Sequence, residues 1–302
     1  MFLACFHGSC ISSAMFSTSC VSNALAVKFA AEAGVYISWG RWAASASVPG
    51  VVCLLLMPLA IYLLQPPSVK ETPDAPEKAR AELARAGPMS RDEWVTAAAL
   101  SITVSLWIFG PALGVDNVAA ALCGLVLLLL SGVVSWQDCL DNGQAWDTLV
   151  WFAALIAMAS ALNREGFIPW LAAQVVRAVG GLRLGWPAAS LLVVGTYFYS
   201  HYLFASISAH VGSMYGAFLA VAVSCGAPPV PAALALAQLS ALMGCLTVYG
   251  ISSAPLYFNC GFVGQAEWYR TGLVLSVFYI AVWLAIGGLW WKAIGLFDEG
   301  RI

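Results

Sequence analysis

The sequence predicts an all-α polytopic membrane protein, and two observations support that prediction. Of its 302 residues, 61% are hydrophobic and only 9% charged, with a mean hydropathy of +0.85, whereas roughly 25% of the residues of a soluble domain are charged. Apolar runs close to the length of about twenty residues that crosses a bilayer as a helix recur along the chain. A membrane β-barrel would instead show short alternating strands.

Charge and cysteine content exclude other classes. The net charge is −2, and the thirteen Lys and Arg are too scattered to form a basic face, so we expect no nucleic-acid partner. Nine cysteines include no CxxC pair, which argues against a disulfide framework and a zinc site. We therefore expect no metal and no cofactor.

The first interrupted apolar stretch is "ISSAMFSTSCVSNAL", residues 11–25, a Ser/Thr cluster that ends near Asn23. Uninterrupted runs, each expected to form a membrane span, follow at 46–64, 94–113, 118–134, 149–162 and 271–291. Lys and Arg are balanced between alternate connections, so the positive-inside rule does not decide the orientation.

Two polar stretches separate these spans. Residues 65–92 alternate in charge and predict a solvated loop with one short helix at 76–86; a plain linker is the alternative. Residues 170–182, with Arg177 and Arg183 near one end, have the pattern of an amphipathic helix at the membrane surface.

A polar window, "SHYLFASISAHVGSMYGAF" (200–218), interrupts the next apolar stretch. Its flanking arms, 186–198 and 211–224, would each span roughly 20 Å as helices and could not cross the membrane alone. They predict a re-entrant hairpin whose tip faces a watery cavity near mid-membrane. The alternative is one long helix with its hydroxyls packed against neighbouring helices.

A second broken span is expected in "LMGCLTVYGISSAPLYF" (242–258), unwound over 247–255, because Pro255 lacks an N–H and Gly250 is conformationally free. It matches the interruption at 11–25, which suggests a duplicated half. Paired broken spans of this kind point to a transporter's substrate site.

Four segments and one loop carry a resemblance to a known family that runs through the whole chain. The segments are "AWDTLVWFAALIAMASALNREG", "TYFYSHYLFASISAH", "LMGCLTVYGISSAPLYF" and "VWLAIGGLWWKAIGLF", and the loop is "PPSVKETPDAPEKARAELARAGPMSRDEW". The chain resembles the divalent anion/sodium symporter family, in particular its plastid-type 2-oxoglutarate/malate translocators and their bacterial relatives.

The resemblance implies an inverted-repeat fold in which each repeat supplies a re-entrant hairpin, tipped by a Ser-Asn-Thr-like motif, and a broken helix facing it. It implies elevator-type exchange of 2-oxoglutarate for malate by a homodimer, in a plastid inner envelope or a bacterial plasma membrane. Phe204, Ala205 and Ser206 would form the second tip. Ala205 replaces the Asn, which argues against sodium coordination; a sodium-coupled dicarboxylate symporter is the alternative.

No Lys or Arg lies within the broken regions apart from Lys28, just beyond the first. Helix N-termini, free N–H groups and hydroxyls would then bind the dicarboxylate. His201 and His210 flank the tip and could donate to a carboxylate or bond a backbone carbonyl, whereas His7 is expected to pack. The candidate substrate-binding residues, each with a purely structural role as its alternative, are Ser206, Ser208, Ala205, Thr247, Gly250, Ser252, Ser253, Ser19, Asn23 and His201.

Two rival functions remain. An intramembrane hydrolase would use Ser206 or Ser208 with a histidine, but no acidic residue and no Gly-x-Ser-x-Gly motif accompanies them. A non-transporting fragment with a structural or regulatory role is the other rival.

The expected organisation follows from the repeat. A partner hairpin should precede Ile11, where only ten residues stand. We therefore expect the first hairpin to be missing and the chain to be the C-terminal part of a longer transporter, unable alone to exchange dicarboxylates or to stay monodisperse in detergent. Met1 is not followed by an Arg/Ser-rich plastid signal. The predicted parts are a first-repeat remnant (1–64), the solvated loop (65–92), scaffold helices (93–163), an interfacial helix (164–185) and the second-repeat transport region (186–297).

Overall fold

The structure is a computed structural model that describes residues 1–298 apart from 68, 70, 144, 147, 148 and most of 151–184. Every regular element in the described part is helical, which confirms the all-α prediction. The described chain forms two compact units, Met1–Gln65 with Trp151–Ile302, and Pro66–Val150. The expected span 149–162 and the interfacial helix 170–182 lie largely outside the described residues.

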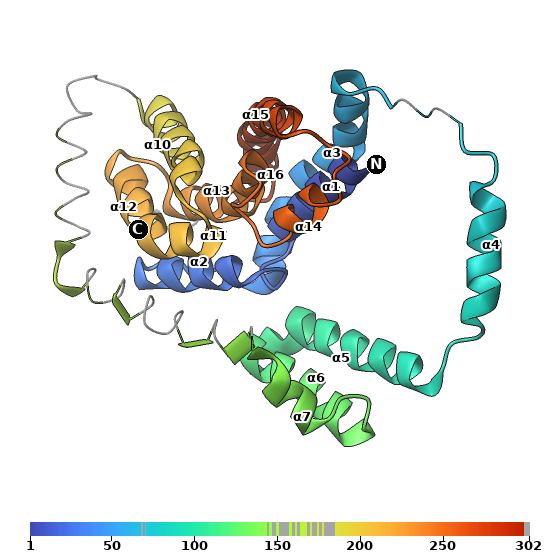
Figure 1. Cartoon of the computed structure of the whole chain (residues 1–302). Helices are drawn as coiled ribbons and strands as arrows, with labels where there is room; N and C mark the ends of the chain where they lie inside the picture. Colours follow the sequence, from blue (N-terminus) through green and yellow to red (C-terminus); the bar gives the residue numbers. More distant parts are fainter. Residues whose placement is uncertain are drawn as a thin grey trace. The chain divides into compact units, whose positions relative to one another are not determined.

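The larger unit contains the broken segments and the hairpin (Figure 1). Its α-helices are α1 (Phe2–Met15), α2 (Val21–Glu32), α3 (Trp39–Leu64), α10 (Trp186–Ser200), α11 (Ile207–His210), α12 (Gly216–Ser224), α13 (Pro229–Leu242), α14 (Ala254–Phe258), α15 (Gln265–Ala281) and α16 (Gly288–Ala293). Short 3-10 turns η1 (His201–Leu203) and η3 (Met243–Leu246) and π-helical turns η2 (Val211–Tyr215) and η4 (Val282–Gly287) connect them.

Among the described residues, five helical stretches are long and apolar enough to cross a membrane. They are Trp39–Leu64, Arg91–Gly110, Ile207–Ser224, Pro229–Leu246 and Gln265–Ala293. The expected spans 46–64, 94–113 and 271–291 correspond to three of these.

Helix α13 is the centre of the larger unit. Of the residues in Pro229–Leu246, 89% are buried, and α13 packs against α1, α2, α3, α10, α12 and α15. Gln238 lies fully buried in its middle. Its amide nitrogen donates to Ser45 Oγ at 2.6 Å, and its carbonyl oxygen accepts from the Trp283 indole at 2.9 Å. The side chain therefore joins α3, α13 and η4.

We expect Gln238→Leu to lower the free energy of unfolding by about 1–3 kcal/mol, because the buried Trp283 N–H would lose its acceptor. Unfolding in mixed micelles titrated with SDS, followed by tryptophan fluorescence, measures the loss. Gln65→Leu is the matched control, since at the end of α3 it removes only a part-buried bond to the Thr271 hydroxyl and an exposed one to the Glu267 carbonyl. Equal stability of the two variants would contradict this role of Gln238.

Helix α3 is tied to the last helix at a proline. Pro49 has no N–H to offer the Ser45 carbonyl four residues earlier. The Trp291 indole donates to that carbonyl instead, at 2.9 Å, and Trp290 donates to the adjacent Ala44 carbonyl at 2.7 Å. A backbone acceptor released inside α3 is therefore satisfied from α16.

The smaller unit contains α4 (Ala75–Ala86), α5 (Arg91–Leu113), α6 (Asn117–Ser131) and α7 (Trp136–Asp141), with α5 packed on α6. Helix α4 confirms the helix expected at 76–86. The predicted span 118–134 is longer than the helix that forms there. Helix α6 has 15 residues and ends at Ser131, whose carbonyl accepts from Arg91 at 3.3 Å.

Helix α7 starts with a capping box. The Ser135 hydroxyl donates to Asp138 at 2.7 Å and its backbone N–H does so at 2.8 Å. These two hydrogen bonds lower the pKa of the exposed Asp138 carboxyl below its ordinary value. The bonds fix the start of a helix that follows directly on α6.

Candidate functional site

The polar window of the second half forms a helical hairpin. Its first arm, α10 with η1, packs against its second arm through α12 (Figure 1). Residues 204–206 form the non-helical tip. The prediction of two arms of equal length was wrong: the second arm begins at Ile207, not 211, and Ile207–Ser224 is long enough to span a membrane. One uninterrupted helix through the window is excluded by the turn at the tip.

The second break faces this hairpin tip. Residues 247–253 are non-helical between η3 and α14, close to the predicted 247–255. The Ile207 N–H donates to the Gly250 carbonyl at 3.1 Å, and the Tyr249 hydroxyl donates to the Tyr202 carbonyl at 3.1 Å. Two hydrogen bonds thus join the tip to the unwound segment.

The first break covers residues 16–20, between α1 and α2. The Asn23 amide nitrogen closes it by donating to the carbonyls of Ser13 and Phe16 at 2.8 and 2.9 Å. The hydroxyl of Ser19, which is exposed, lies 2.6 and 2.7 Å from the same two carbonyls and can donate to either one. Asn23 and Ser19 therefore replace backbone donors that the break removes. This is the purely structural role that is the alternative to substrate binding for these two residues.

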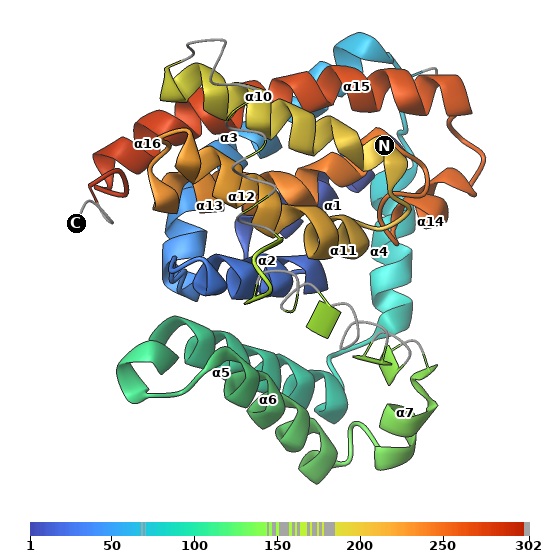
Figure 2. The same cartoon turned by 90° about the vertical axis from the view of Figure 1, so that its left-hand side faces the viewer.

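Helix α2 brings the first break to the hairpin. It packs against both α11 and η2, and the two turned views show it running beneath α11 (Figure 1, Figure 2). Asn23 lies fully buried in the first turn of α2. Its side-chain oxygen Oδ1 has no hydrogen-bond partner in the described part of the chain. Helix α2, which begins directly after the first break, therefore packs against the second arm of the hairpin.

The two histidines beside the tip form a pair. Their rings are nearly parallel, and Nδ1 of His201 lies 3.2 Å from Nδ1 of His210. Nε2 of His210 lies 3.1 Å from the Ser200 hydroxyl, while Phe204 stacks on the His210 ring at 4.5 Å. Both histidines are fully buried. His7 packs in α1 as predicted, bonded to the Tyr279 hydroxyl at 3.0 Å.

Several candidate side chains have unused hydrogen-bonding capacity. Ser206 is half-buried, Ser208 likewise, and neither makes a side-chain hydrogen bond within the described residues, whereas Ala205 and Ser252 are exposed. Native proteins rarely leave buried polar atoms without a hydrogen-bond partner. In the described part of this chain, such atoms in and around the breaks are Ser17 Oγ, Asn23 Oδ1, His201 Nε2, Thr247 Oγ1 and Ser253 Oγ.

Sequence reasoning did not single out Ser17, although it lies in the same Ser/Thr cluster as Ser19 and is buried. It also missed Ser200 as the partner of His210. The position of Ser17 within the Ser/Thr cluster could have indicated it. Ser200 could not be found from the sequence, because its contact with His210 joins α10 to α11 across the tip.

The hydrolase geometry is not formed. The histidines bind each other and Ser200, not Ser206 or Ser208. The remaining ring nitrogen of His210 faces His201, where the base of such a hydrolase would instead be oriented by a third, usually acidic, group. In the described residues, no group of three or more His, Cys, Asp or Glu is arranged to hold a metal ion.

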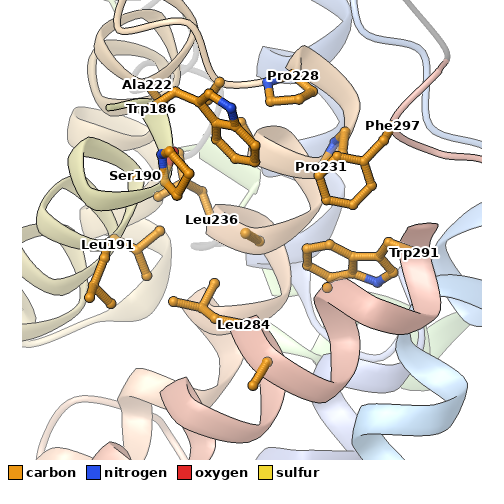
Figure 3. A pocket seen from close by; sticks show the side chains of 17 residues that line it. Trp186, Ser190, Leu191, Ala222, Pro228, Pro231, Leu236, Leu284, Trp291 and Phe297 are labelled. Atoms are coloured by element: carbon orange, nitrogen blue, oxygen red, sulfur yellow. The ribbon is translucent and has the colours of Figure 1, made fainter. Parts of the chain in front are cut away.

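A separate apolar pocket of about 390 Å³ lies between α10, α13 and the last helix (Figure 3). Trp186, Leu284, Trp291 and Phe297 line it, with Ser190 contributing a hydroxyl. Among the described residues that line this pocket there is no predicted site residue and no charged side chain. Its lining does not suit a dianion, so the polar site at the breaks and the apolar pocket are distinct.

Comparison with known proteins gives consistent matches. The family model described as "Sodium:sulfate symporter transmembrane region" matches residues 1–297. Dicarboxylate transporter 1, chloroplastic, of Arabidopsis thaliana is 50% identical over 98% of this chain and 53% of its own length. Dicarboxylate transporter 2, chloroplastic, of Spinacia oleracea is 44% identical over 95% and 51%. The citrate/succinate antiporter of Escherichia coli K12 is 34% identical over 92% and 57%. The chain thus spans about half the length of these relatives.

Proposed function

Because this integral membrane chain belongs to the sodium:sulfate symporter family, we propose that it acts in a carrier that exchanges dicarboxylates, with 2-oxoglutarate and malate as the favoured pair. The exchange follows an elevator-type mechanism in which the larger unit carries the substrate. The observation that carries the proposal is the junction of the hairpin tip with the unwound segment through Ile207 and Gly250.

The chemistry of this junction suits a dianion that must also be released. Ser206 and Ser208, both half-buried, flank Ile207, and the buried Thr247 begins the unwound segment to which Ile207 is bonded. No Lys, Arg, Asp or Glu occurs in 186–224 or 229–258. Neutral donors bind carboxylates through dipoles and hydrogen bonds without holding them as tightly as a buried fixed cation would.

The relatives' names support the dicarboxylate class and a location in a chloroplast membrane or, for the bacterial relative, a bacterial membrane. We place this chain in a plastid inner envelope or a bacterial plasma membrane accordingly. The family resemblance also leads us to propose a homodimer for the complete carrier.

The test is counterflow in liposomes. We would use a chimera in which residues 1–297 replace the matched part of the Arabidopsis relative, so that the chain stands in a full-length carrier. Labelled 2-oxoglutarate should enter vesicles preloaded with malate and stay outside empty vesicles. Absence of counterflow by a folded chimera, when the parent relative transports, would refute the proposal.

Because Ala205 stands where the family motif has Asn, we expect exchange to proceed equally well when sodium is replaced by potassium or choline. Initial counterflow rates at matched ionic strength measure this. Uptake that requires sodium would instead identify the chimera as a sodium-coupled symporter.

We expect Ser206→Trp in the chimera to abolish counterflow while the protein still folds, because the indole would fill space at the tip that the substrate needs. Ser206→Ala removes one hydroxyl, worth about 0.5–1.5 kcal/mol, so the apparent affinity should fall only several-fold. Ser213→Trp is the matched control on the second arm, where the serine is bonded to its own helix. Normal exchange by Ser206→Trp would remove Ser206 from the site.

A further inference from the structure

Hydrogen positions in the histidine pair follow from its neighbours. Ser200 has one hydroxyl hydrogen, and we assign it to the shorter of its two contacts, the 2.8 Å bond to the Tyr197 carbonyl, which can only accept. Ser200 must then accept from Nε2–H of His210, 3.1 Å away. In neutral His210 this leaves Nδ1 without hydrogen, so His201 donates to it from its own Nδ1 across 3.2 Å. Neutral His201 therefore has a bare lone pair on Nε2.

That lone pair is on the side of His201 that faces Gly250. Nε2 of His201 is buried and has no hydrogen-bond partner among the described residues, and a Cβ placed on Gly250 would lie 2.5 Å from it and 2.6 Å from Thr247 Oγ1. The nitrogen thus abuts the unwound segment that meets the hairpin tip. In this form it cannot donate to a carboxylate, contrary to the sequence-based expectation of a neutral donor.

We propose that each dicarboxylate binds together with one proton, which adds to Nε2 of His201; this inference rests on the proposed function. The proton comes from bulk water and forms an N–H bond, making His201 an imidazolium. The added hydrogen turns an unpartnered acceptor into a donor toward a substrate carboxylate. The dianion and the proton then enter the site with a combined charge of −1, and both leave on the other side.

The surroundings make the proton depend on the substrate. Described neighbours offer His201 no carboxylate, so the imidazolium is costly when the site is empty. A bound dianion supplies the missing negative charge.

Other titratable groups around the pair are accounted for by their own contacts. Tyr197 from α10 faces His210, and its hydroxyl is bonded to Ser240. Cys245 from η3 donates to the Gly272 carbonyl. Tyr249 from the unwound segment donates to Tyr202. Helix α2 brings Lys28 and Glu32, both exposed.

The first experiment observes the histidine rings directly. The chain has only three histidines. They are studied in the chimera after the histidines outside residues 1–297 are replaced, so that ¹⁵N-imidazole NMR in nanodiscs resolves each ring, with His7→Gln, His201→Asn and His210→Asn assigning them. Without substrate at pH 8, we expect His201 to carry hydrogen on Nδ1 alone and His210 on Nε2 alone. Hydrogen on Nε2 of neutral His201 would overturn the inference.

The second experiment uses the chimera between about pH 6.5 and 8.5, well above the ordinary carboxyl pKa of about 4, so that malate stays a dianion. Calorimetry in buffers of different ionisation enthalpy should show uptake of about one proton per malate, and the affinity should fall by up to about tenfold per pH unit as pH rises. His201→Asn keeps a donor for His210 but cannot take the proton, so it should lose the pH dependence. His7→Gln should retain it.

The outcomes separate the two proposals. Counterflow with the same pH dependence in wild type and His201→Asn, or malate binding without proton uptake, overturns the proton site while dicarboxylate exchange stands. Absence of both malate binding and counterflow overturns the proposed function and the proton site with it.

Discussion

Gly272→Ala is expected to destabilise the larger unit by about 1–3 kcal/mol, the usual cost of forcing extra volume into a packed interior. Gly272 lies buried in α15, where a Cβ would overlap the backbone carbonyl oxygen of Cys245 in η3 and lie 3.5 Å from the Cα of Leu246. Because the neighbouring atoms are backbone, no side-chain rotation relieves the overlap. SDS titration in mixed micelles measures the change.

The same substitution at Gly288 is the control. A Cβ there meets no atom of the described residues within 4 Å, so Gly288→Ala should be neutral or stabilise the helix by up to about 1 kcal/mol. If both variants had the same stability as the wild type, the close approach of α15 to η3 would not exist in the folded protein.

Gly250→Ala is expected to slow exchange strongly with a much smaller effect on folding. Its Cβ would lie 2.5 Å from Nε2 of His201 and 2.6 Å from Oγ1 of Thr247, so both groups must move. We expect the counterflow rate of the chimera to drop by about a hundredfold, the scale on which a displacement of about 1 Å acts at an enzyme site. Initial rates in preloaded vesicles give this number.

Gly195→Ala, in the first hairpin arm, is the matched control because a Cβ there has no neighbour within 4 Å. Its exchange rate should equal that of the wild type. Wild-type exchange by Gly250→Ala would show that the junction between Gly250 and His201 has no part in transport.

Local chemistry explains which elements could be predicted from the sequence. The short helix in the solvated loop was predicted to within one residue, because its proline start and its run of Ala, Glu, Lys and Arg act over neighbouring residues. The unwound segment before α14 was predicted because Pro255 cannot complete the helical hydrogen bonds around it. Both signals are carried by residues inside the element itself.

Contacts between distant segments explain the rest. The hairpin's second arm starts four residues early because Ile207 N–H bonds to Gly250, 43 residues away. The first break lies at 16–20 because Asn23 can replace its lost backbone donors. The pairing of His201 with His210, and the tautomers it requires, arises only when α10 folds back on α11. No periodicity in the sequence encodes such pairings.

The link between Pro49 and Trp291 also constrains how the sequence can diverge. The indole of Trp291 satisfies the carbonyl that Pro49 leaves free in α3. A lineage that first lost Trp291 would retain a buried carbonyl without a donor, which is selected against. One that first replaced Pro49 would regain the helical N–H and release Trp291 from this task. The two positions are therefore expected to change in a preferred order, proline first, and the pair is an epistatic unit across 242 positions of the chain.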